Sequence, residues 1–309
     1  MMKKLKSTPL KPGSTIGIIA PGSPVDDPLL IKSAQMYLEE RNFQTVLGET
    51  ATDGKGYLSG SDWVRQKDLE NMWSNDNVNA IWCLRGGYGT LRLLNRLYYG
   101  IFEKKPKILM GFSDITALEL GLWAQIKLVT FHGPVLTTLS SEFSTSQAIR
   151  MLTGKTDSVF SWPESPKLNY VPFKEGRTTG IILGGNLTTL VSMIGSSYFP
   201  ALDDVILFIE EVKEASYRID RLLTQLIFSG ALDSVAAVVV GECVPVAEET
   251  EMDMINVFAE RLHLLKCPSA YGFPIGHLDE QWTLPQGIMA EIDIREKSLV
   301  LLECPFNLQ

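Results

Sequence analysis

Residues 108–116 read Ile-Leu-Met-Gly-Phe-Ser-Asp-Ile-Thr, and this stretch decides the fold that we expect. Residues 108–110 are apolar and follow Pro106, which is typical of the start of a buried strand. After a short turn, apolar residues recur with the period of one helix face, at Ile115, Leu118, Leu122 and Trp123. The stretch therefore predicts a buried strand, a sharp turn that carries Ser113, and a helix.

The position of Ser113 points to chemistry. Its hydroxyl would lie at the N-terminus of the helix, where backbone N–H groups are free to stabilise an oxyanion. This arrangement follows the logic of a nucleophile elbow, although Ile115 stands where the G-x-S-x-G pattern has its last glycine. A helix cap formed by Ser113 or Asp114 explains the same local pattern, so the turn alone leaves both interpretations open.

Strands and helices alternate through the first half of the chain. Strands are expected at residues 15–20, 80–84 and 107–110, and helices at residues 29–40 and from the glycine-rich segment 85–89 through Leu97. Such alternation indicates a parallel sheet covered on both faces, as in flavodoxin-like and Rossmann-like domains. Sites in these sheets lie beyond the carboxyl ends of the strands, where both Gly86-Gly87 and Ser113 are expected.

The second half of the chain begins with a different pattern of residues. Residues 154–177 contain Trp162 and several prolines without helical period, and we interpret them as a linker with room for an edge strand. Beyond it, strands are expected at residues 180–186, 205–209, 235–240, 287–294 and 298–302, and an amphipathic helix at residues 219–227. The expected organisation is an N-terminal domain at 1–153 and a C-terminal α+β, barrel-like domain at 178–309.

Composition excludes several classes of function. The 309 residues are 45% hydrophobic and 21% charged, with a net charge of −8. Lysine and arginine cluster only in the first few residues, which argues against nucleic acid and anionic membranes as partners. No run approaches the roughly 20 apolar residues that span a bilayer, and no signal-peptide pattern follows the basic start. We therefore expect a cytoplasmic protein.

Neither a metal nor a cofactor is expected. The four cysteines, which are Cys83, Cys243, Cys267 and Cys304, are scattered and never spaced as C-x-x-C. The chain has no phosphate-binding G-x-x-x-x-G-K-[ST] motif, and residues 85–89 (Arg-Gly-Gly-Tyr-Gly) do not fit the dinucleotide motif. Adjacent glycines at Gly86 and Gly87 instead predict a backbone that a substrate approaches closely.

A serine nucleophile needs a base, and the chain has three histidines. His263 lies in an expected surface helix, where solvation explains it. His132 follows a strand and could border the site, but a packing or turn role explains it better. His277 lies in a loop rich in glycine and proline, and loops on a rigid scaffold often carry function.

The carboxylate that would orient the base is less clear from the residues. Glu210 follows the apolar residues 206–209 and is expected at the C-terminal end of a strand, where a partly buried carboxylate needs a partner. Glu211 and Glu214 are rivals for the same role, and a solvated loop acid is the alternative for each of them.

Several short segments, in this order and spacing, resemble the LD-carboxypeptidase family, the muramoyltetrapeptide carboxypeptidases. The matching segments are residues 16–21, 85–89, 111–114, 184–187, 209–211, 217–221 and 276–277. The resemblance extends over nearly the whole chain. It implies a Ser-Glu-His triad formed by Ser113, Glu210 and His277. One departure is Glu211, where the family often has aspartate, and this does not touch the presumed acid.

The resemblance also implies further site residues. It implies an oxyanion hole built from backbone N–H groups near Gly86 and Gly87 and from Asp114. A terminal carboxylate must be recognised as well, which favours an arginine or a backbone N–H cluster. Arg85 and Arg218 are candidates, with a structural ion pair as the alternative role for each.

The implied reaction is hydrolysis of an L,D-amide bond, which releases the terminal D-alanine of murein tetrapeptide during cell-wall recycling. The family also implies a cytoplasmic homodimer. One alternative is a microcin C self-immunity peptidase, which resembles the same triad but cleaves aminoacyl-adenylate analogues; no clear added loop for a nucleobase is visible here. Another is a catalytically silent ligand-binding module, against which all three triad residues argue. A third alternative is a hydrolase that depends on a cysteine or on a metal ion.

Overall fold

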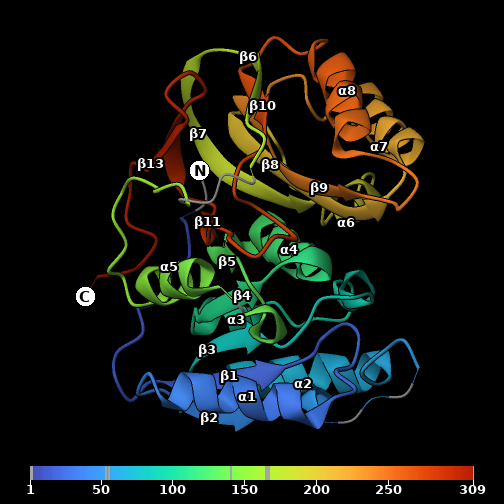
Figure 1. Ribbon diagram of the computed structural model, residues 1–309. Helices are drawn as coiled ribbons and strands as arrows, with labels where there is room; N and C mark the ends of the chain where they lie inside the picture. The colour runs from blue at the N-terminus through green and yellow to red at the C-terminus, as the bar shows by residue number, and fades with distance from the viewer. Residues whose placement is uncertain (1–2, 53, 55, 140, 164–167, 309) are drawn as a thin grey trace.

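The computed structural model describes residues 3–52, 54, 56–139, 141–163 and 168–308. The chain forms two β-sheets, which lie one above the other in Figure 1 with helices packed against each. The lower sheet comes mainly from the N-terminal half and the upper sheet from the C-terminal half. The predicted α/β architecture is confirmed. Residues 164–167 of the predicted linker, with Pro166, lie outside the described residues.

The first sheet has six strands in the order β11-β5-β4-β3-β1-β2. They are β1 (Thr15–Ile19), β2 (Gln44–Leu47), β3 (Val78–Cys83), β4 (Ile108–Gly111), β5 (Thr130–His132) and β11 (Leu284–Gln286). β1 to β5 are parallel, and the order 2-1-3-4-5 is that of flavodoxin-like sheets. Nearly every side chain of β1, β3 and β4 is buried, because helices cover the sheet and its apolar runs have no solvent face.

The helices of this half are α1 (Pro28–Glu39), α2 (Asp62–Ser74), α3 (Gly100–Lys104), α4 (Thr116–Ile126) and α5 (Glu142–Leu152). The start of α1 shows why its sequence is helical. The Asp27 side chain accepts a hydrogen bond from the Leu29 amide, and Pro28 is the first helical residue. The side chains that α1 buries, Ile31, Ala34 and Leu38, lie on one face at helical spacing.

Helix α4, which follows Ser113, is buried around almost its whole circumference. The spacing of Ile115, Leu118 and Leu122 predicts one apolar face, but side chains on the other faces of the helix are buried as well. Figure 1 shows the reason: α4 lies between the two sheets. It packs on β5 below and against the second sheet and its first helix above. The helix that begins three residues after the candidate nucleophile is therefore the central element of the interface.

Strand β11 joins the two halves in a second way. It is antiparallel to β5, with Leu284 opposite His132 and Gln286 opposite Thr130. These residues follow the candidate base His277 by only a few positions, yet they complete the first sheet. The sequence places them in the expected C-terminal domain at 178–309, and those domain boundaries stay a prediction.

The second sheet has seven strands in the order β13-β12-β7-β8-β9-β10-β6. They are β6 (Val171–Lys174), β7 (Arg177–Asn186), β8 (Val205–Glu214), β9 (Ala237–Pro245), β10 (Ser269–Tyr271), β12 (Met289–Asp293) and β13 (Ser298–Leu301). The central strands β7 to β10 are parallel, and the strands at both edges are antiparallel. Figure 1 shows this sheet strongly curved, so the expected barrel-like form is a curled half-barrel. Strand β6 is an edge strand within the predicted linker.

Three helices accompany this sheet: α6 (Leu187–Ser192), α7 (Ser216–Phe228) and α8 (Glu251–Leu262). Helix α7 buries Ile219, Leu223 and Leu226, as its amphipathic pattern predicts. Helices α7 and α8 pack against each other on the same side of the sheet (Figure 1).

The predicted helix from the glycine-rich segment through Leu97 is wrong. A short 3₁₀ helix spans Thr90–Leu93, and turns follow it. Asp114 explains the difference, because its carboxylate accepts a hydrogen bond from the Thr90 amide at 2.9 Å, and the Thr90 hydroxyl donates to the Asp114 carbonyl. These contacts tie the start of the segment to the Ser113 turn. None of the helices in the described ranges is long and apolar enough to cross a membrane.

Candidate active site

The loops that follow β1, β3 and β4 meet at the carboxyl edge of the first sheet. Strands β1 and β3 are neighbours at the point where the strand order reverses, which is where ligands bind in such sheets. The Ser23 amide, beyond β1, donates to the Gly86 carbonyl, beyond β3, at 3.1 Å. The Ser23 hydroxyl accepts from the Tyr88 amide at 3.1 Å and donates to the Tyr57 carbonyl at 2.8 Å. The predicted meeting of Gly86-Gly87 and Ser113 at one edge is confirmed.

Ser113 adopts a backbone conformation that few side chains tolerate. Its φ is 64°, in the left-handed region, and it begins the 3₁₀ turn that leads into α4. Such strain persists only where the surroundings impose it, and it is common at active sites. Gly111 makes the turn possible, because a Cβ there would lie 2.8 Å from the Ile115 side chain. The turn thus keeps the first glycine of the elbow pattern and folds Ile115 back over it.

Gly86 lies against the Ser113 turn. A Cβ on Gly86 would lie 2.9 Å from the Ser113 Cβ and 3.2 Å from the Asp114 amide nitrogen. Within the described residues, neither the Gly86 nor the Gly87 amide donates to a protein acceptor. Backbone N–H groups close to a serine nucleophile can stabilise an oxyanion when they point toward it.

The Asp114 side chain has a structural task. It is 6% exposed, and burial, the largest effect, raises the pKa of its carboxyl. Hydrogen bonds from the Thr90 and Gly89 amides act in the opposite direction and favour the charged form. The carboxylate thereby holds the loop after β3 against the Ser113 turn.

Glu210 lies inside β8 and not at its end. The apolar run ends at Ile209, but the strand continues to Glu214, because the next carboxylates find partners within the fold. The ladder with β9 pairs Ile209 with Val240 and Glu211 with Cys243, so it skips Glu210. The Glu210 side chain is fully buried.

Glu210 and His277 form a close pair. The Glu210 Oε2 lies 2.6 Å from the His277 Nδ1, and the Glu210 Oε1 has no partner within the described residues. Gly276 permits this approach, because its φ is 101° and a Cβ there would lie 2.5 Å from the Glu210 Cβ. The glycine that precedes the histidine is therefore a steric requirement of the pair.

The surroundings set the pKa of His277. Desolvation is the largest single effect and lowers it, but the hydrogen bond and charge of Glu210, with the charge of Glu211, outweigh it and raise the pKa above 6.5. Lys213 opposes this shift, so its ammonium group acts on the imidazole. Lys213 is exposed, has a left-handed φ of 56°, and was not predicted as a site residue. In the sequence, only its position three residues after Glu210 indicates that it belongs near the site.

The imidazole lies beside the residue that precedes the nucleophile. The ring centroids of His277 and Phe112 are 4.7 Å apart, and Ser113 follows Phe112. No hydrogen bond joins the Ser113 hydroxyl to His277 in the described part of the chain. Catalytic hydrogen bonds in sites without substrate are often long and shorten when substrate binds. The structure brings all three predicted residues to the interface between the two halves.

The two rival carboxylates have other partners. The Glu211 Oε1 accepts from the Asn186 side-chain amide at 2.8 Å, and its Oε2 accepts from the Thr188 amide at 2.8 Å. Burial, the largest effect, raises the pKa of Glu211, and the charge of Glu210 adds to this. Glu214 pairs with Arg218 at 3.4 Å. Neither carboxylate contacts a histidine by a hydrogen bond among the described residues.

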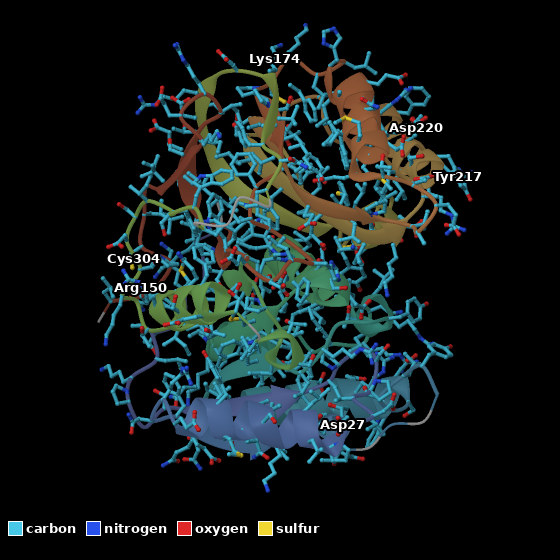
Figure 2. The ribbon with its side chains drawn as sticks, viewed as in Figure 1. Asp27, Arg150, Lys174, Tyr217, Asp220 and Cys304 are labelled. Atoms are coloured by element: carbon cyan, nitrogen blue, oxygen red, sulfur yellow. The ribbon has the colours of Figure 1, made fainter. Side chains whose placement is uncertain are left out.

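The two arginines proposed from the sequence contact residues other than Ser113, Glu210 and His277. Arg85 is exposed and donates to the Pro24 carbonyl at 2.9 Å. Arg218 pairs with Glu214 and lies 5.9 Å from the ring of Tyr217. Figure 2 shows Tyr217 at the periphery of the molecule, on α7.

The remaining histidines and cysteines have structural roles. His132 is fully buried and is the last residue of β5, whereas the sequence predicted that it follows a strand; His263 is exposed at the C-terminal end of α8, as predicted. Cys83 and Cys243 are buried, and burial raises the pKa of each thiol well above its ordinary value. The described residues contain no cluster of His, Cys, Asp or Glu side chains arranged to hold a metal ion.

Comparison with known proteins places this arrangement in a family. Residues 16–133 match the model of the LD-carboxypeptidase N-terminal domain, and residues 179–292 match that of the C-terminal domain. The chain belongs to the LD-carboxypeptidase family. A probable murein peptide carboxypeptidase of Bacillus subtilis (strain 168) is 35% identical over 303 residues, which cover 96% of this chain and 94% of the relative. Family membership makes the present chain a carboxypeptidase of the serine-hydrolase type.

Solved structures agree with the fold. The microcin C7 self-immunity protein MccF superposes with a TM-score of 0.91 at 26% identity, over 98% of this chain and 100% of that chain. A muramoyltetrapeptide carboxypeptidase from Oxalobacter formigenes gives a TM-score of 0.78 at 27% identity, over 93% and 97% of the two chains. The relatives of this chain therefore include both a muramoyltetrapeptide carboxypeptidase and a microcin self-immunity protein.

Proposed function

We propose that this carboxypeptidase hydrolyses the L,D-amide bond that precedes the terminal D-alanine of murein tetrapeptide, in cell-wall recycling. One observation carries the proposal: the buried Glu210 carboxylate and the partly exposed His277, 2.6 Å apart between Oε2 and Nδ1, lie beside the strained Ser113 turn. The names of the murein peptide carboxypeptidase relatives support the choice of substrate.

The triad residues act in sequence. His277 Nε2 takes the proton of the Ser113 hydroxyl as the oxygen attacks the scissile carbonyl carbon. The imidazolium then gives that proton to the leaving amine, D-alanine departs, and an acyl-enzyme ester remains on Ser113. Water gives a proton to His277 as it attacks the ester, and the imidazolium then protonates the departing Ser113 oxygen, which releases the shortened peptide and the free serine. Glu210 keeps the proton of the imidazole on Nδ1 and stabilises the imidazolium.

The developing oxyanion is stabilised by the backbone. The proposed donors are the amides of Gly86, Gly87 and Asp114, and the close approach of Gly86 to Ser113 and to the Asp114 amide nitrogen supports this choice. Because these groups are fixed by strand ends and by the Asp114–Thr90 contacts, they need little reorganisation during the reaction.

The terminal carboxylate of the substrate requires a cation or amide donors. Arg85 and Arg218 are candidates, and Lys213 joins them because its charge acts on His277. Among the three, Lys213 has the shortest separation along the chain from a triad residue and makes no ion pair in the described residues. It is the first of the three to substitute in a binding study.

The test is release of D-alanine from purified murein tetrapeptide by the wild-type protein and by Ser113→Ala. We expect the variant to lose nearly all turnover, with exposed Ser146→Ala as a matched control that keeps it. Unchanged hydrolysis by Ser113→Ala would contradict the proposal and favour a ligand-binding module.

A second substrate class has support of its own, because the MccF structures superpose at a TM-score of 0.91 and one of them is described as a complex with aspartyl sulfamoyl adenosine. The same preparation is therefore offered an aminoacyl sulfamoyl adenosine. Cleavage of that compound with a kcat/KM above that for tetrapeptide would replace the murein assignment with the second class.

The cytoplasmic location and the homodimer implied by the family resemblance belong to this proposal. Light scattering after size-exclusion chromatography tests the dimer: a mass of twice 34.3 kDa is expected, and a mass of 34.3 kDa contradicts it.

A further inference from the structure

Helix α4 contains one charged residue, Glu119, and it is fully buried. The Glu119 Oε2 accepts a hydrogen bond from the Gln286 side-chain amide at 2.7 Å and lies 3.3 Å from the His132 Nδ1. Burial, the largest effect, raises the pKa of this carboxyl. A buried carboxyl group costs free energy unless its partners are well placed, so these contacts are specific.

Gln286 continues the contact into the second sheet. It belongs to β11, and its Oε1 accepts from the Gly184 amide of β7 at 3.0 Å. One side-chain amide thus bonds to the helix that begins near the nucleophile and to a central strand of the sheet that carries Glu210. Gly184 in turn pairs with Phe208, two residues before Glu210.

His132, the second partner of Glu119, packs against aromatic rings from both halves of the chain. Its ring centroid lies 6.2 Å from that of Phe112 and 4.8 Å from that of Phe208. Phe112 precedes Ser113 and also contacts His277. The imidazole of His132 is therefore packed between the residue before the nucleophile and the strand of the acid.

A second hydrogen bond from α4 crosses the same interface. The Thr116 hydroxyl accepts from the Asn186 amide at 3.0 Å, and Thr116 lies one turn before Glu119 on the same helix face. Gly185 leaves the space for it, because a Cβ there would lie 2.3 Å from the Thr116 hydroxyl oxygen. Two hydrogen bonds therefore connect β7 of the second sheet to the first half of the molecule, one from the Gly184 amide to Gln286 and one from the Asn186 amide to Thr116.

We propose that Glu119, Gln286 and His132 are positioning residues that hold Ser113 in register with the Glu210–His277 pair. Apolar packing tolerates small sliding of one surface over another, whereas hydrogen bonds depend on distance and direction and therefore favour one arrangement. The triad is divided between the two sheets, so its geometry depends on that arrangement. The inference rests on the proposed triad, and it adds the residues that align its two parts.

The test is Gln286→Leu, which keeps the volume and removes both hydrogen bonds. We expect kcat for tetrapeptide to fall about 10- to 100-fold with little change in KM, because a displacement of about 1 Å can reduce the rate by that factor. If the leucine variant does not fold, Gln286→Asn replaces it, since the shorter amide cannot reach both partners and predicts a loss of the same kind.

Two further variants separate positioning from stability. Glu119→Gln keeps an oxygen that accepts from Gln286 and should retain kcat within a few-fold, whereas Glu119→Leu should not. Thr130→Val is the matched control, because Thr130 lies two residues before His132 on β5, is fully buried, and its hydroxyl has no partner within the described residues. We expect this control to keep the wild-type kcat.

The NMR titration of His277 in Gln286→Leu gives a readout that does not depend on turnover. We expect its pKa to match that of the wild-type protein, because the Glu210–His277 pair lies within the second half. A folded Gln286→Leu variant with wild-type kcat would overturn the inference, and so would equal losses in Glu119→Gln and Glu119→Leu. Loss of the triad assignment itself would instead appear as turnover that survives Ser113→Ala.

Discussion

Replacing Glu210 by Gln gives the sharpest test of the proposed base. The wild-type carboxylate can only accept a hydrogen bond from the His277 Nδ1, over 2.6 Å, and this leaves Nε2 free to take a proton. A glutamine of the same shape can present its amide N–H to Nδ1. The imidazole would then carry its proton on Nε2 and could not act as a base.

The size of the effect follows from this change of tautomer. An asparagine in place of the corresponding carboxylate of a serine protease triad lowers kcat by about 10⁴. At 1.36 kcal/mol for each tenfold change, this is about 5 kcal/mol of transition-state stabilisation. We expect the same order here, because Glu210 is fully buried and water cannot replace it.

The pH dependence moves in a definite direction. The neutral imidazole is the active form, so wild-type activity falls as the pH drops through the raised pKa of His277, above 6.5. In Glu210→Gln the desolvation that lowers this pKa remains, and the main effect that raises it is gone. The residual activity should therefore show its acid limb at a lower pH than the wild-type protein.

The raised pKa of His277 should also appear in the pH dependence of protein stability. A histidine whose pKa is raised by folding stabilises the protein fully below the unfolded value near 6.5, and this contribution is lost as the pH rises through the folded value. Wild-type protein should thus lose some stability over that window, measured by thermal unfolding, and Glu210→Gln should not.

The assay is D-alanine release at a series of pH values, together with NMR titration of the imidazole. A loss smaller than tenfold, or an acid limb that stays in place, would refute the assignment of Glu210 as the orienting acid. Glu214→Gln is the control, because this partly exposed carboxylate makes no hydrogen bond to His277 in the described structure.

Three other predictions concern neighbouring features. Gly86→Ala places a Cβ 2.9 Å from that of Ser113, and we expect kcat to fall about 10²- to 10³-fold in steady-state kinetics, as for loss of an oxyanion donor. Gly185→Ala, with its φ of 140° and a clash with Thr116, should lower the free energy of unfolding by about 1–3 kcal/mol from backbone strain alone, measured by denaturant titration. A bulky thiol reagent should modify exposed Cys304 without loss of turnover, as mass spectrometry and the same assay would show.

The parts of the site that lie close together in the sequence could be predicted. The apolar strand, the turn at Ser113 and the glycines after β3 are local patterns, and the rule for parallel sheets places them at one edge. The pairing of Glu210 with His277 is different, because 67 residues separate them. From the residues alone, Glu210, Glu211 and Glu214 were all candidates for the acid that orients the base. Only the family resemblance implied that Glu210 has this role.

Long-range contacts account for what the sequence did not reveal. Helix α4 has one predicted apolar face, but it is covered on the other faces because the second sheet lies above it. Glu119 left a weak signal, a lone acid in a helix that is otherwise uncharged. Its partner Gln286 follows it by 167 residues, and no local pattern connects the two.

Strand β11 has a consequence for how the protein is made. The edge of β5 stays open until residues 284–286 have been synthesised and can pair with it, more than 150 residues after β5 itself. An open strand edge can pair with other chains, so aggregation during synthesis should be greatest late and not early. The same order means that a nascent chain that already contains Ser113 still lacks Glu210 and His277, so the proposed triad is complete only after both have been added.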